Sequence, residues 1–353
     1  MDLTIRELPA NSQKAKNLED LKFGERFTDR MFLMEYAPGR GWHGARIEEF
    51  HNFQLSPATM ALHYAQEIFE GMKAYHRKDG GAAIFRPKEN WKRMNASAEA
   101  LCMPAFDEKF VMDALLELIK LERGWVPTKR GTSLYIRPTM IGVDPVIKVR
   151  ASEKYLFYII LSPVGAYFSA DRTMSKIMVE DRFVRAVRGG LGLAKTGANY
   201  AASIRAGMEA AKKGCDQVLW LDGVERKYVE EIGSMNIFFV IDGVVTTPAL
   251  NGSILPGITR KSVLELAGKL GFKTSERAIE IGEIIKGIES GAVSEMFGSG
   301  TACVINPVSA VLYKDTEYAV TKEPGKYAKV FHEYLTGIQH GEKEDMFGWM
   351  MPV

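Results

Sequence analysis

The sequence predicts a chain of mixed α/β (α+β) class that folds into two domains. The first observation is size, because 353 residues, 46% hydrophobic and 25% charged, can bury two separate cores. The second is an alternation of short runs rich in β-branched and aromatic residues with segments of helical periodicity. The third is a turn-rich, polar stretch after residue 163. We therefore expect a small N-terminal domain at 1–163, a connecting loop at 164–175 and a large C-terminal domain at 176–353.

Local signals place the elements of the first domain. Ser56 and Pro57 are typical of a helix start, as N-cap and first helical residue. The turn residues Asp79-Gly80-Gly81 separate two apolar runs and predict a hairpin. The expected strands are residues 32–36, 73–76, 82–86, 134–141 and 155–161, and the expected helices are residues 57–69, 87–101 and 108–124.

The second domain continues the alternation. Asp242-Gly243 predicts a tight hairpin, and residues 255–259 lead into a helix that ends at Gly271. A further helix starts at Asn199, where Tyr200, Ile204 and Met208 recur at four-residue spacing. The other expected strands are residues 217–221, 227–231, 236–241 and 292–297, and the other expected helices are residues 281–287 and 327–338.

Composition excludes several classes of function. The 46 basic and 44 acidic residues give a net charge of +2, which predicts neither nucleic-acid nor membrane-surface binding. Three cysteines far apart in sequence and six histidines without metal-ligand spacing predict no disulfide framework and no metal site. The acidic N-terminal segment lacks the apolar core of a secretion signal. We therefore expect a soluble cytoplasmic protein.

Lys195 is the candidate catalytic residue. It lies in a turn of small residues, Ala194-Lys195-Thr196-Gly197-Ala198, directly before the helix expected from Asn199. A partly desolvated lysine in such a turn loses proton affinity and becomes a nucleophilic amine, as imine chemistry requires.

Three other segments of the same domain complete a possible site. The helix start at 255–259 and the glycine turn at 298–301 both present backbone N–H groups and hydroxyls that suit a phosphate. The strand-like segment 229–236 contains Glu230 and Glu231, whose side chains point to opposite faces, one toward solvent and one inward. A buried carboxylate there could keep a heteroaromatic nitrogen protonated.

A P-loop NTPase is the alternative from another class. Residues 189–196 nearly spell Gly-x-x-x-x-Gly-Lys-Thr, and residues 218–222 form an apolar run ending in an aspartate. The interpretation fails because Ala194 replaces the glycine beside the lysine, and because residues 182–188 are too charged for a buried strand.

The motifs, taken in order, resemble the branched-chain aminotransferases, pyridoxal-phosphate enzymes of fold type IV with the D-amino-acid aminotransferase-like fold. The matching segments are residues 69–75, 90–94, 132–138, 164–168, 191–200, 231–236, 255–260, 298–302 and 349–353. The similarity covers nearly the whole chain. D-amino-acid aminotransferases and aminodeoxychorismate lyases share this fold, but they match residues 135–137 and the C-terminal segment less well.

The resemblance implies a role for each site residue. Lys195 would carry pyridoxal 5'-phosphate covalently and move the proton at the substrate Cα. Tyr200 would bind the cofactor's phenolic oxygen, and Glu231, chosen by its interval from Asn236, would pair with the ring nitrogen. The cofactor and its phosphate would also be held by Arg93, Ser234, Ile258, Thr259 and Thr301. The substrate would be bound by Tyr64, Phe69, Tyr135, Arg137, Val149, Tyr167, Thr301 and Ala302, with Tyr64 and Arg137 receiving the distal carboxylate of glutamate. For Arg137 an inter-strand ion pair is the alternative.

The expected reaction is ping-pong transamination between branched-chain L-amino acids and 2-oxoglutarate. The resemblance further implies a homodimer in which the loop at 142–149 completes the pocket of the partner subunit.

Overall fold

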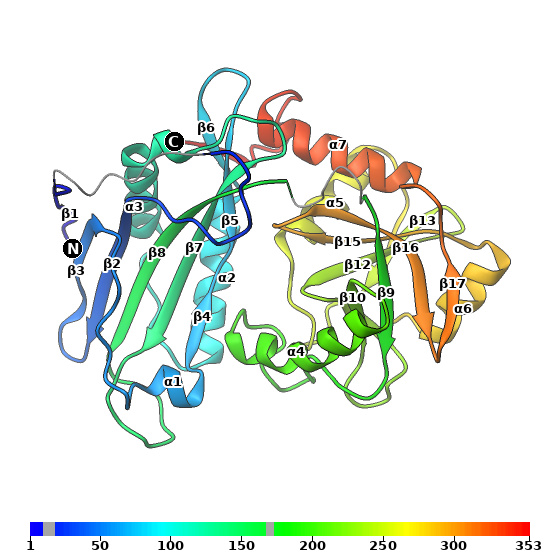
Figure 1. Ribbon diagram of the computed structural model, residues 1–353, viewed down its shortest axis with the longest axis horizontal. Helices are drawn as coiled ribbons and strands as arrows, with labels where there is room; N and C mark the ends of the chain where they lie inside the picture. The colour runs from blue at the N-terminus through cyan, green and yellow to red at the C-terminus, as the bar shows by residue number, and fades with distance from the viewer. Residues whose placement is uncertain (10–17, 167–172) are drawn as a thin grey trace. The chain divides into compact units, whose positions relative to one another are not determined.

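The structure is a computed structural model that describes residues 1–9, 18–166 and 173–353. Its contacts divide the chain into two compact units, each described separately below (Figure 1). The first unit contains Met1–Ala166, Ala194–Gly197 and Gly337–Val353, and the second contains Tyr167–Leu193 and Ala198–Thr336. The sequence placed Lys195 and the C-terminal residues in the second domain, whereas their contacts group them with the first unit.

The first unit is built on a nine-stranded sheet. Its strands are β1 (Thr4–Ile5), β2 (Arg30–Ala37), β3 (Gly41–Glu49), β4 (Glu67–Phe69), β5 (Met72–His76), β6 (Ala82–Phe85), β7 (Ser133–Gly142), β8 (Tyr155–Val164) and β18 (Met350–Pro352). The order is β1-β3-β2-β8-β7-β5-β6-β18, and β4 pairs with β7. The expected hairpin is confirmed, because β5 and β6 are antiparallel neighbours.

Helices pack on this sheet. Helices α2 (Pro87–Ala100) and α3 (Glu108–Leu121) and a short 3-10 helix, η1 (Arg123–Trp125), cover one face, whereas Ala61 of α1 (Met60–Tyr64) packs on the opposite face. Asp107 caps α3 by accepting the backbone N–H groups of Lys109 and Phe110. Trp91 of α2 and Leu115 of α3 are fully buried against the apolar side of the sheet and form the main core of the unit.

The helix expected at 57–69, with Ser56 as N-cap, is wrong at both ends, because α1 begins only at Met60 with Thr59 as its N-cap. Helix α1 ends at Tyr64 because Ala65 adopts a left-handed conformation with φ 50°. The following residues Glu67–Phe69 are extended and pair with β7. Ile68, expected on a helix, is therefore buried from a strand.

The second unit also contains a nine-stranded sheet. Its strands are β9 (Ser175–Glu180), β10 (Gln217–Leu221), β11 (Val229–Ile232), β12 (Met235–Ile241), β13 (Val244–Pro248), β14 (Thr274–Arg277), β15 (Val293–Gly300), β16 (Val304–Tyr313) and β17 (Thr316–Ala319). The order is β11-β10-β9-β16-β15-β12-β13-β14, with β17 on β16. An additional β11–β12 pairing closes six of the strands into a ring.

Four helices accompany these strands: α4 (Gly197–Lys212), α5 (Ile258–Lys269), α6 (Ile281–Ser290) and α7 (Lys326–His340). Helix α4 begins two residues after Lys195, which confirms the predicted helix. Its packing face consists of Ala206 and Ala210, buried against Met178 and Trp220. The predicted stripe is not that face, since Ile204 and Met208 are exposed.

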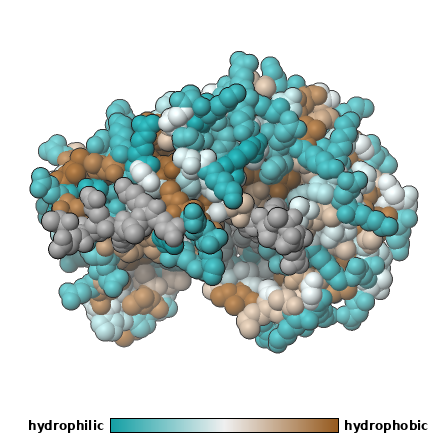
Figure 2. Space-filling view, turned by 45° about the horizontal axis from the view of Figure 1, so that its top comes forward, coloured by the Kyte–Doolittle hydropathy of each residue, from teal (hydrophilic) through white to brown (hydrophobic). Residues whose placement is uncertain are grey.

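Hydrophilic side chains cover most of the face shown in Figure 2, and apolar side chains lie among them in separate groups. Within the described ranges, none of the helices combines the length and the apolar character that crossing a bilayer requires.

Candidate active site

Lys195 is fixed through its backbone in the first unit. Its N–H donates to Ser97 Oγ of α2 at 3.0 Å, and its carbonyl accepts the N–H of Phe69 at 3.0 Å. Its Nζ lies 5.1 Å from the centre of the Phe69 ring, within the range of a cation–π interaction. The lysine is partly buried. Two elements from an earlier part of the chain therefore set its position.

The face of the first sheet opposite the main core carries the predicted substrate residues. Phe69 pairs with Thr139, and Tyr135, Arg137 and Thr139 alternate along β7, so these side chains share one face. The Arg137 guanidinium lies 4.8 Å from the Phe69 ring centre and donates to the Tyr135 hydroxyl at 2.9 Å. Its Nε is buried and has no hydrogen-bond partner among the described residues. Two aromatic rings and a hydrogen-bond donor without a partner among the described residues therefore lie together on this face.

Gly71 makes room for this arrangement. A Cβ at this position would overlap the Tyr135 hydroxyl. Only glycine therefore lets the Tyr135 ring lie where it meets Arg137.

Arg93 forms a buried ion pair with Glu70. Its Nε and Nη2 donate to the two carboxylate oxygens at 2.7 and 2.9 Å, in the bidentate geometry that favours arginine. Burial alone would raise the pKa of Glu70, but the charge and hydrogen bonds of Arg93, with Lys195 and Asn90, hold the pKa below its usual value. The guanidinium predicted to meet a phosphate is thus occupied by Glu70 in this structure.

Three predicted substrate residues lie apart from this face or outside the description. Tyr64 ends α1 with an exposed side chain, and Val149, 81% exposed, lies between β7 and β8. No hydrogen bond or ring contact joins either residue to Arg137 in the described part of the chain. Tyr167 lies outside the described residues.

A buried polar row crosses three strands of the second unit. Glu231 of β11 pairs with Asn236 of β12, which pairs with Ser299 of β15. Directly paired residues point to the same face, so the carboxylate, amide and hydroxyl lie side by side. All three are buried, and Ser299 Oγ has no hydrogen-bond partner among the described residues.

The loop before α5 is anchored to this row. The N–H of Leu255 donates to Glu231 Oε1 at 3.0 Å, and Asn236 Nδ2 donates to the Leu255 carbonyl at 2.9 Å. A Cβ at Gly257 would overlap Asn236 Oδ1, so the loop approaches closely only with glycine there. Gly257 is the N-cap of α5 and offers no side-chain acceptor. The first N–H groups of α5 are therefore left for an anion.

The other predicted cofactor residues of the second unit lie on α4, α5 and two turns of the sheet. Ile258 and Thr259 are the first two residues of α5 and are both buried. Thr301 and Ala302 form the turn between β15 and β16 and are partly buried, and Tyr200 is partly buried in the first turn of α4. Ser234 instead lies exposed at the β11–β12 turn, outside the row.

Glu230 departs from the sequence prediction. One carboxylate of the Glu230–Glu231 pair was expected to face solvent, but both are buried. Glu230 accepts hydrogen bonds from the hydroxyl of Ser253 and, at 3.1 Å, from Asn251. The prediction fails because the loop before α5 covers the second face of β11 and supplies these donors.

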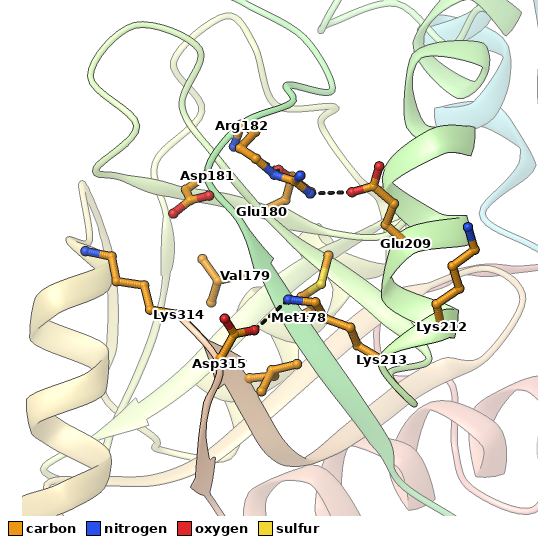
Figure 3. Close-up of a pocket in the computed structure, with 11 residues that line it drawn as sticks. Met178, Val179, Glu180, Asp181, Arg182, Glu209, Lys212, Lys213, Lys314 and Asp315 are labelled. Atoms are coloured by element: carbon orange, nitrogen blue, oxygen red, sulfur yellow. Dashed lines mark hydrogen bonds and ion pairs between the residues drawn. The ribbon is translucent and has the colours of Figure 1, made fainter.

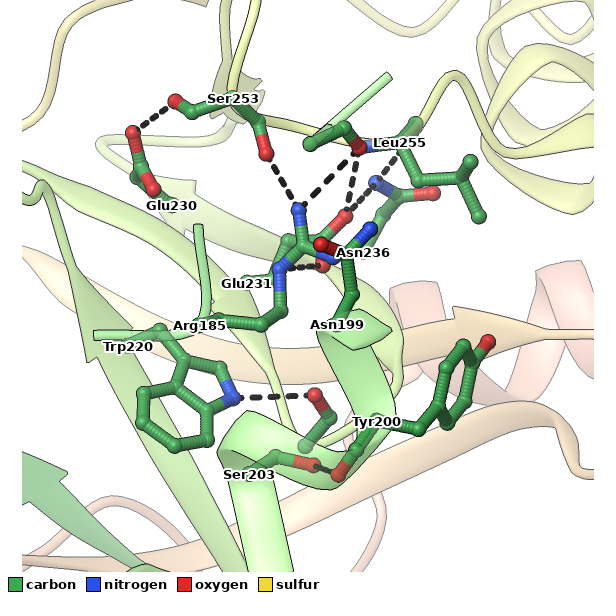
Figure 4. Close-up of polar contacts among 12 residues, drawn as sticks. Arg185, Asn199, Tyr200, Ser203, Trp220, Glu230, Glu231, Asn236, Ser253 and Leu255 are labelled. Carbon is green, nitrogen blue, oxygen red and sulfur yellow. Dashed lines mark hydrogen bonds and ion pairs between the residues drawn. The ribbon is translucent and has the colours of Figure 1, made fainter. Parts of the chain in front are cut away.

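Arg185 is a site residue that the sequence reasoning missed. Its Nε lies 2.7 Å from Glu231 Oε2, and both side chains are under one-tenth exposed (Figure 4). Its Nη2 donates to the backbone carbonyls of Ser253 and, at 3.4 Å, Gly192. The sequence signal that could have identified it is a lone arginine between apolar residues, Phe183-Val184-Arg185-Ala186-Val187. From the sequence, this segment is interpreted only as too charged for a buried strand.

The chain that leads to Lys195 is held by the same network. Asn199 Nδ2 donates to the Leu191 carbonyl at 2.8 Å. A Cβ at Gly192 would overlap the backbone of Ser253, so the two backbones are in direct contact. Arg185 therefore links Glu231 to the segment immediately before the lysine.

These groups fit pyridoxal 5'-phosphate by their chemistry. A buried carboxylate suits a protonated ring nitrogen, and the open start of α5 suits a phosphate. The hydroxyls of Ser299 and Thr196, both buried and without a hydrogen-bond partner among the described residues, offer additional hydrogen bonds. The lysine amine supplies the nucleophile.

A separate pocket of about 540 Å³ lies in the second unit between β9, the end of α4 and the β16–β17 turn (Figure 3). Its charged groups are largely paired with one another, as in the Arg182–Glu209 pair and the Lys213–Asp315 pair at 2.6 Å. None of its lining residues is a predicted site residue.

The structure contradicts the P-loop alternative. Strand β9 ends at Glu180, and residues 189–196 follow turns instead of a strand. Asp222, the aspartate at the end of that apolar run, accepts the backbone N–H groups of Val224, Glu225, Lys227 and Tyr228. Its carboxylate therefore stabilises the turn between β10 and β11.

The fold and these groups define a class of enzyme, the amino-transferases that use pyridoxal phosphate. The profile of the family "Amino-transferase class IV" matches residues 67–311, and the chain belongs to this family. The family depends on pyridoxal phosphate.

More specific similarities point within that family. The chain is 51% identical over 336 residues to a "Probable branched-chain-amino-acid aminotransferase" of Staphylococcus epidermidis, covering 95% of this chain and 94% of that protein. It is 47% identical over 352 residues to "Branched-chain-amino-acid aminotransferase 2" of Bacillus subtilis, covering 99% and 97%. The solved branched-chain amino acid aminotransferase from Escherichia coli has a TM-score of 0.73 at 27% identity, covering 91% of this chain and 98% of that one.

Proposed function

We propose that this protein transfers amino groups reversibly between the branched-chain L-amino acids leucine, isoleucine and valine and 2-oxoglutarate. The products are the branched-chain 2-oxo acids and L-glutamate, formed in two half-reactions. The observation that carries the proposal is near half identity over almost the whole chain to proteins named branched-chain-amino-acid aminotransferase. The alternative activities of the fold, D-amino-acid transamination and aminodeoxychorismate cleavage, lack comparable support.

Bound pyridoxal phosphate supplies an aldehyde that takes up the amino group and a ring that stabilises negative charge at the substrate Cα. Lys195 carries the cofactor and moves the Cα proton through its Nζ. Glu231 accepts a hydrogen bond from the ring nitrogen and keeps it protonated, with Arg185 supplying the positive charge that the buried carboxylate needs. Tyr200 binds the phenolic oxygen.

The phosphate belongs at the start of α5 in this proposal. The N–H groups of Ile258 and Thr259 and the hydroxyls of Thr259 and Thr301 are its ligands, because a helix N-terminus favours an anion. Arg93 is proposed as a further phosphate ligand through its N–H groups, with its charge offset by Glu70. Its bidentate bond to Glu70 supports a role in orienting that charge.

The substrate side chain meets the aromatic face of β4 and β7. Phe69 and Tyr135 wall an aliphatic group, and burying the three carbons by which leucine exceeds alanine contributes about 2.4 kcal/mol. Arg137, whose Nε has no partner among the described residues, receives the distal carboxylate of glutamate together with Tyr64. Val149 and Tyr167 complete the side-chain pocket. The α-carboxylate meets the backbone at Thr301 and Ala302.

A homodimer forms part of the proposal. The loop between β7 and β8 exposes Ile147 and Val149, 68% and 81% exposed, and such side chains are typical of an interface. This loop would complete the pocket of the partner subunit. A cytoplasmic location is proposed as well, since all three cysteines are free.

The test is spectroscopic. The purified protein loaded with pyridoxal phosphate is mixed separately with L-leucine, L-glutamate and D-alanine. Loss of the visible cofactor band with the first two donors and its retention with D-alanine are expected. Retention of the band with L-leucine would refute the proposed substrate class.

A further inference from the structure

Glu67 is an acidic residue beside the candidate substrate-binding residues, and none of the proposed roles uses it. It lies at the start of β4, two residues from Phe69, so the two side chains share the face that carries Arg137. Its carboxylate interacts electrostatically with Arg137 and accepts the backbone N–H of Gly197. A Cβ at Gly197 would overlap Glu67 Oε1, so the carboxylate lies directly against the first residue of α4. It is partly buried.

The proposed substrates place opposite demands on this pair of charges. An aliphatic side chain brings no charge, so Arg137 needs the Glu67 carboxylate to offset its desolvation. A diacid brings its own carboxylate to Arg137, and a second anion nearby then repels it. A pocket with a fixed negative charge at Glu67 would favour only the aliphatic substrate.

We propose that Glu67 is a specificity-determining residue that takes up one proton when a diacid binds at Arg137 and is ionised when an aliphatic substrate is bound. This inference rests on the proposed function, because it assumes that both substrates use the same pocket. The proton moves from solvent to a Glu67 carboxylate oxygen, and the charge of the pocket stays balanced in both states.

The surroundings of Glu67 support this exchange. The groups that face it are Arg137 of β7, Tyr158 of β8 and the N–H of Gly197, which follows Lys195 by two residues. Burial raises the pKa of Glu67 and outweighs the lowering by Arg137 and Gly197. Burial also raises the pKa of Tyr158, so this hydroxyl stays neutral. The raised pKa makes it easier to protonate Glu67 than an exposed glutamate, and affinity for a diacid falls as the pH rises above that pKa.

The experiment measures inhibition of the holoenzyme by glutarate, a diacid, and by 4-methylpentanoate, a branched monoacid. For the wild type, the inhibition constant of glutarate relative to that of 4-methylpentanoate is expected to rise by up to about tenfold per pH unit once the pH exceeds the pKa of Glu67. Glu67→Gln keeps an acceptor for Gly197 and removes the charge, so the ratio becomes independent of pH. Glu117→Gln on α3, on the other side of the sheet, is the matched control and keeps the wild-type profile.

A second measurement does not depend on a variant. Calorimetry of the wild type in two buffers of different ionisation enthalpy should show uptake of about one proton with glutarate and none with 4-methylpentanoate. Equal uptake for both ligands, or a pH-dependent ratio that persists in Glu67→Gln, overturns the inference. Failure of the same preparation to transfer amino groups from leucine to 2-oxoglutarate instead refutes the proposed function.

Discussion

The buried Arg185–Glu231 pair gives the sharpest test of the structure. Replacing Arg185 with methionine keeps most of the side-chain volume and removes the charge 2.7 Å from Glu231. The two side chains are 8% and 4% exposed, so Glu231 is left as an unpaired buried anion. Removing one partner of a buried ion pair costs about 3–5 kcal/mol. A loss of ~4 kcal/mol corresponds to roughly a thousandfold larger fraction of opened molecules.

Hydrogen exchange is the appropriate assay because it is measured amide by amide, so the readout can be confined to the second unit. The amides of β11 (Val229–Ile232) should exchange about a thousandfold faster in Arg185→Met. The matched control is Arg182→Met, whose side chain is 59% exposed, so that solvent screens its pair with Glu209 and its loss should change exchange little. Adding Glu231→Gln to Arg185→Met should restore part of the protection. Equal, small effects of the two arginine variants would refute the assignment of Arg185 as the partner of the buried carboxylate.

Three further predictions concern single positions. Gly257→Ala should weaken cofactor binding at least tenfold, measured by titration of the apoenzyme, because its Cβ displaces Asn236; unchanged affinity would contradict the tight loop. Arg93→Met should reduce stability by about 3–5 kcal/mol at pH 7 in urea unfolding. Because the pKa of Glu70 is lowered in the folded protein, its contribution is fully present above about pH 4.5 and is lost as the pH falls below that value, so the deficit should shrink only below about pH 4.5; a constant deficit there would argue against the pair. Burial raises the pKa of Tyr155 to about 12, so stability should fall above about pH 10, and Tyr155→Phe should reduce that fall in alkaline urea melts.

Much of the fold followed from local sequence signals. The hairpins at Asp79-Gly80-Gly81 and Asp242-Gly243 and the helix after Lys195 depend on residues close together in the chain. Such features are readable because their physical causes are local. Helix α4 shows the limit, since Ala206 and Ala210 carry its packing while the larger Ile204 and Met208 face solvent. A helical periodicity counted from large apolar side chains therefore predicts the wrong packing face of α4.

The candidate site was predictable where a residue type implies its chemistry. A lysine in a glycine turn and a carboxylate near an asparagine stood out for that reason. Arg185 did not, because its partner Glu231 is distant in sequence and only the strand register and the loop before α5 bring them together. The burial of Glu230 was missed for the same reason, since the cover comes from Ser253 and Asn251.

The pairing of β18 with β6 has a consequence for biosynthesis. Residues 350–352 add the edge strand to a sheet whose other strands all precede residue 165. On the ribosome, every residue of the second unit is therefore made before the first unit can complete its sheet. Until then β6 remains an unpaired edge strand while the second unit can already fold, so the unit whose synthesis begins first is the last to be completed.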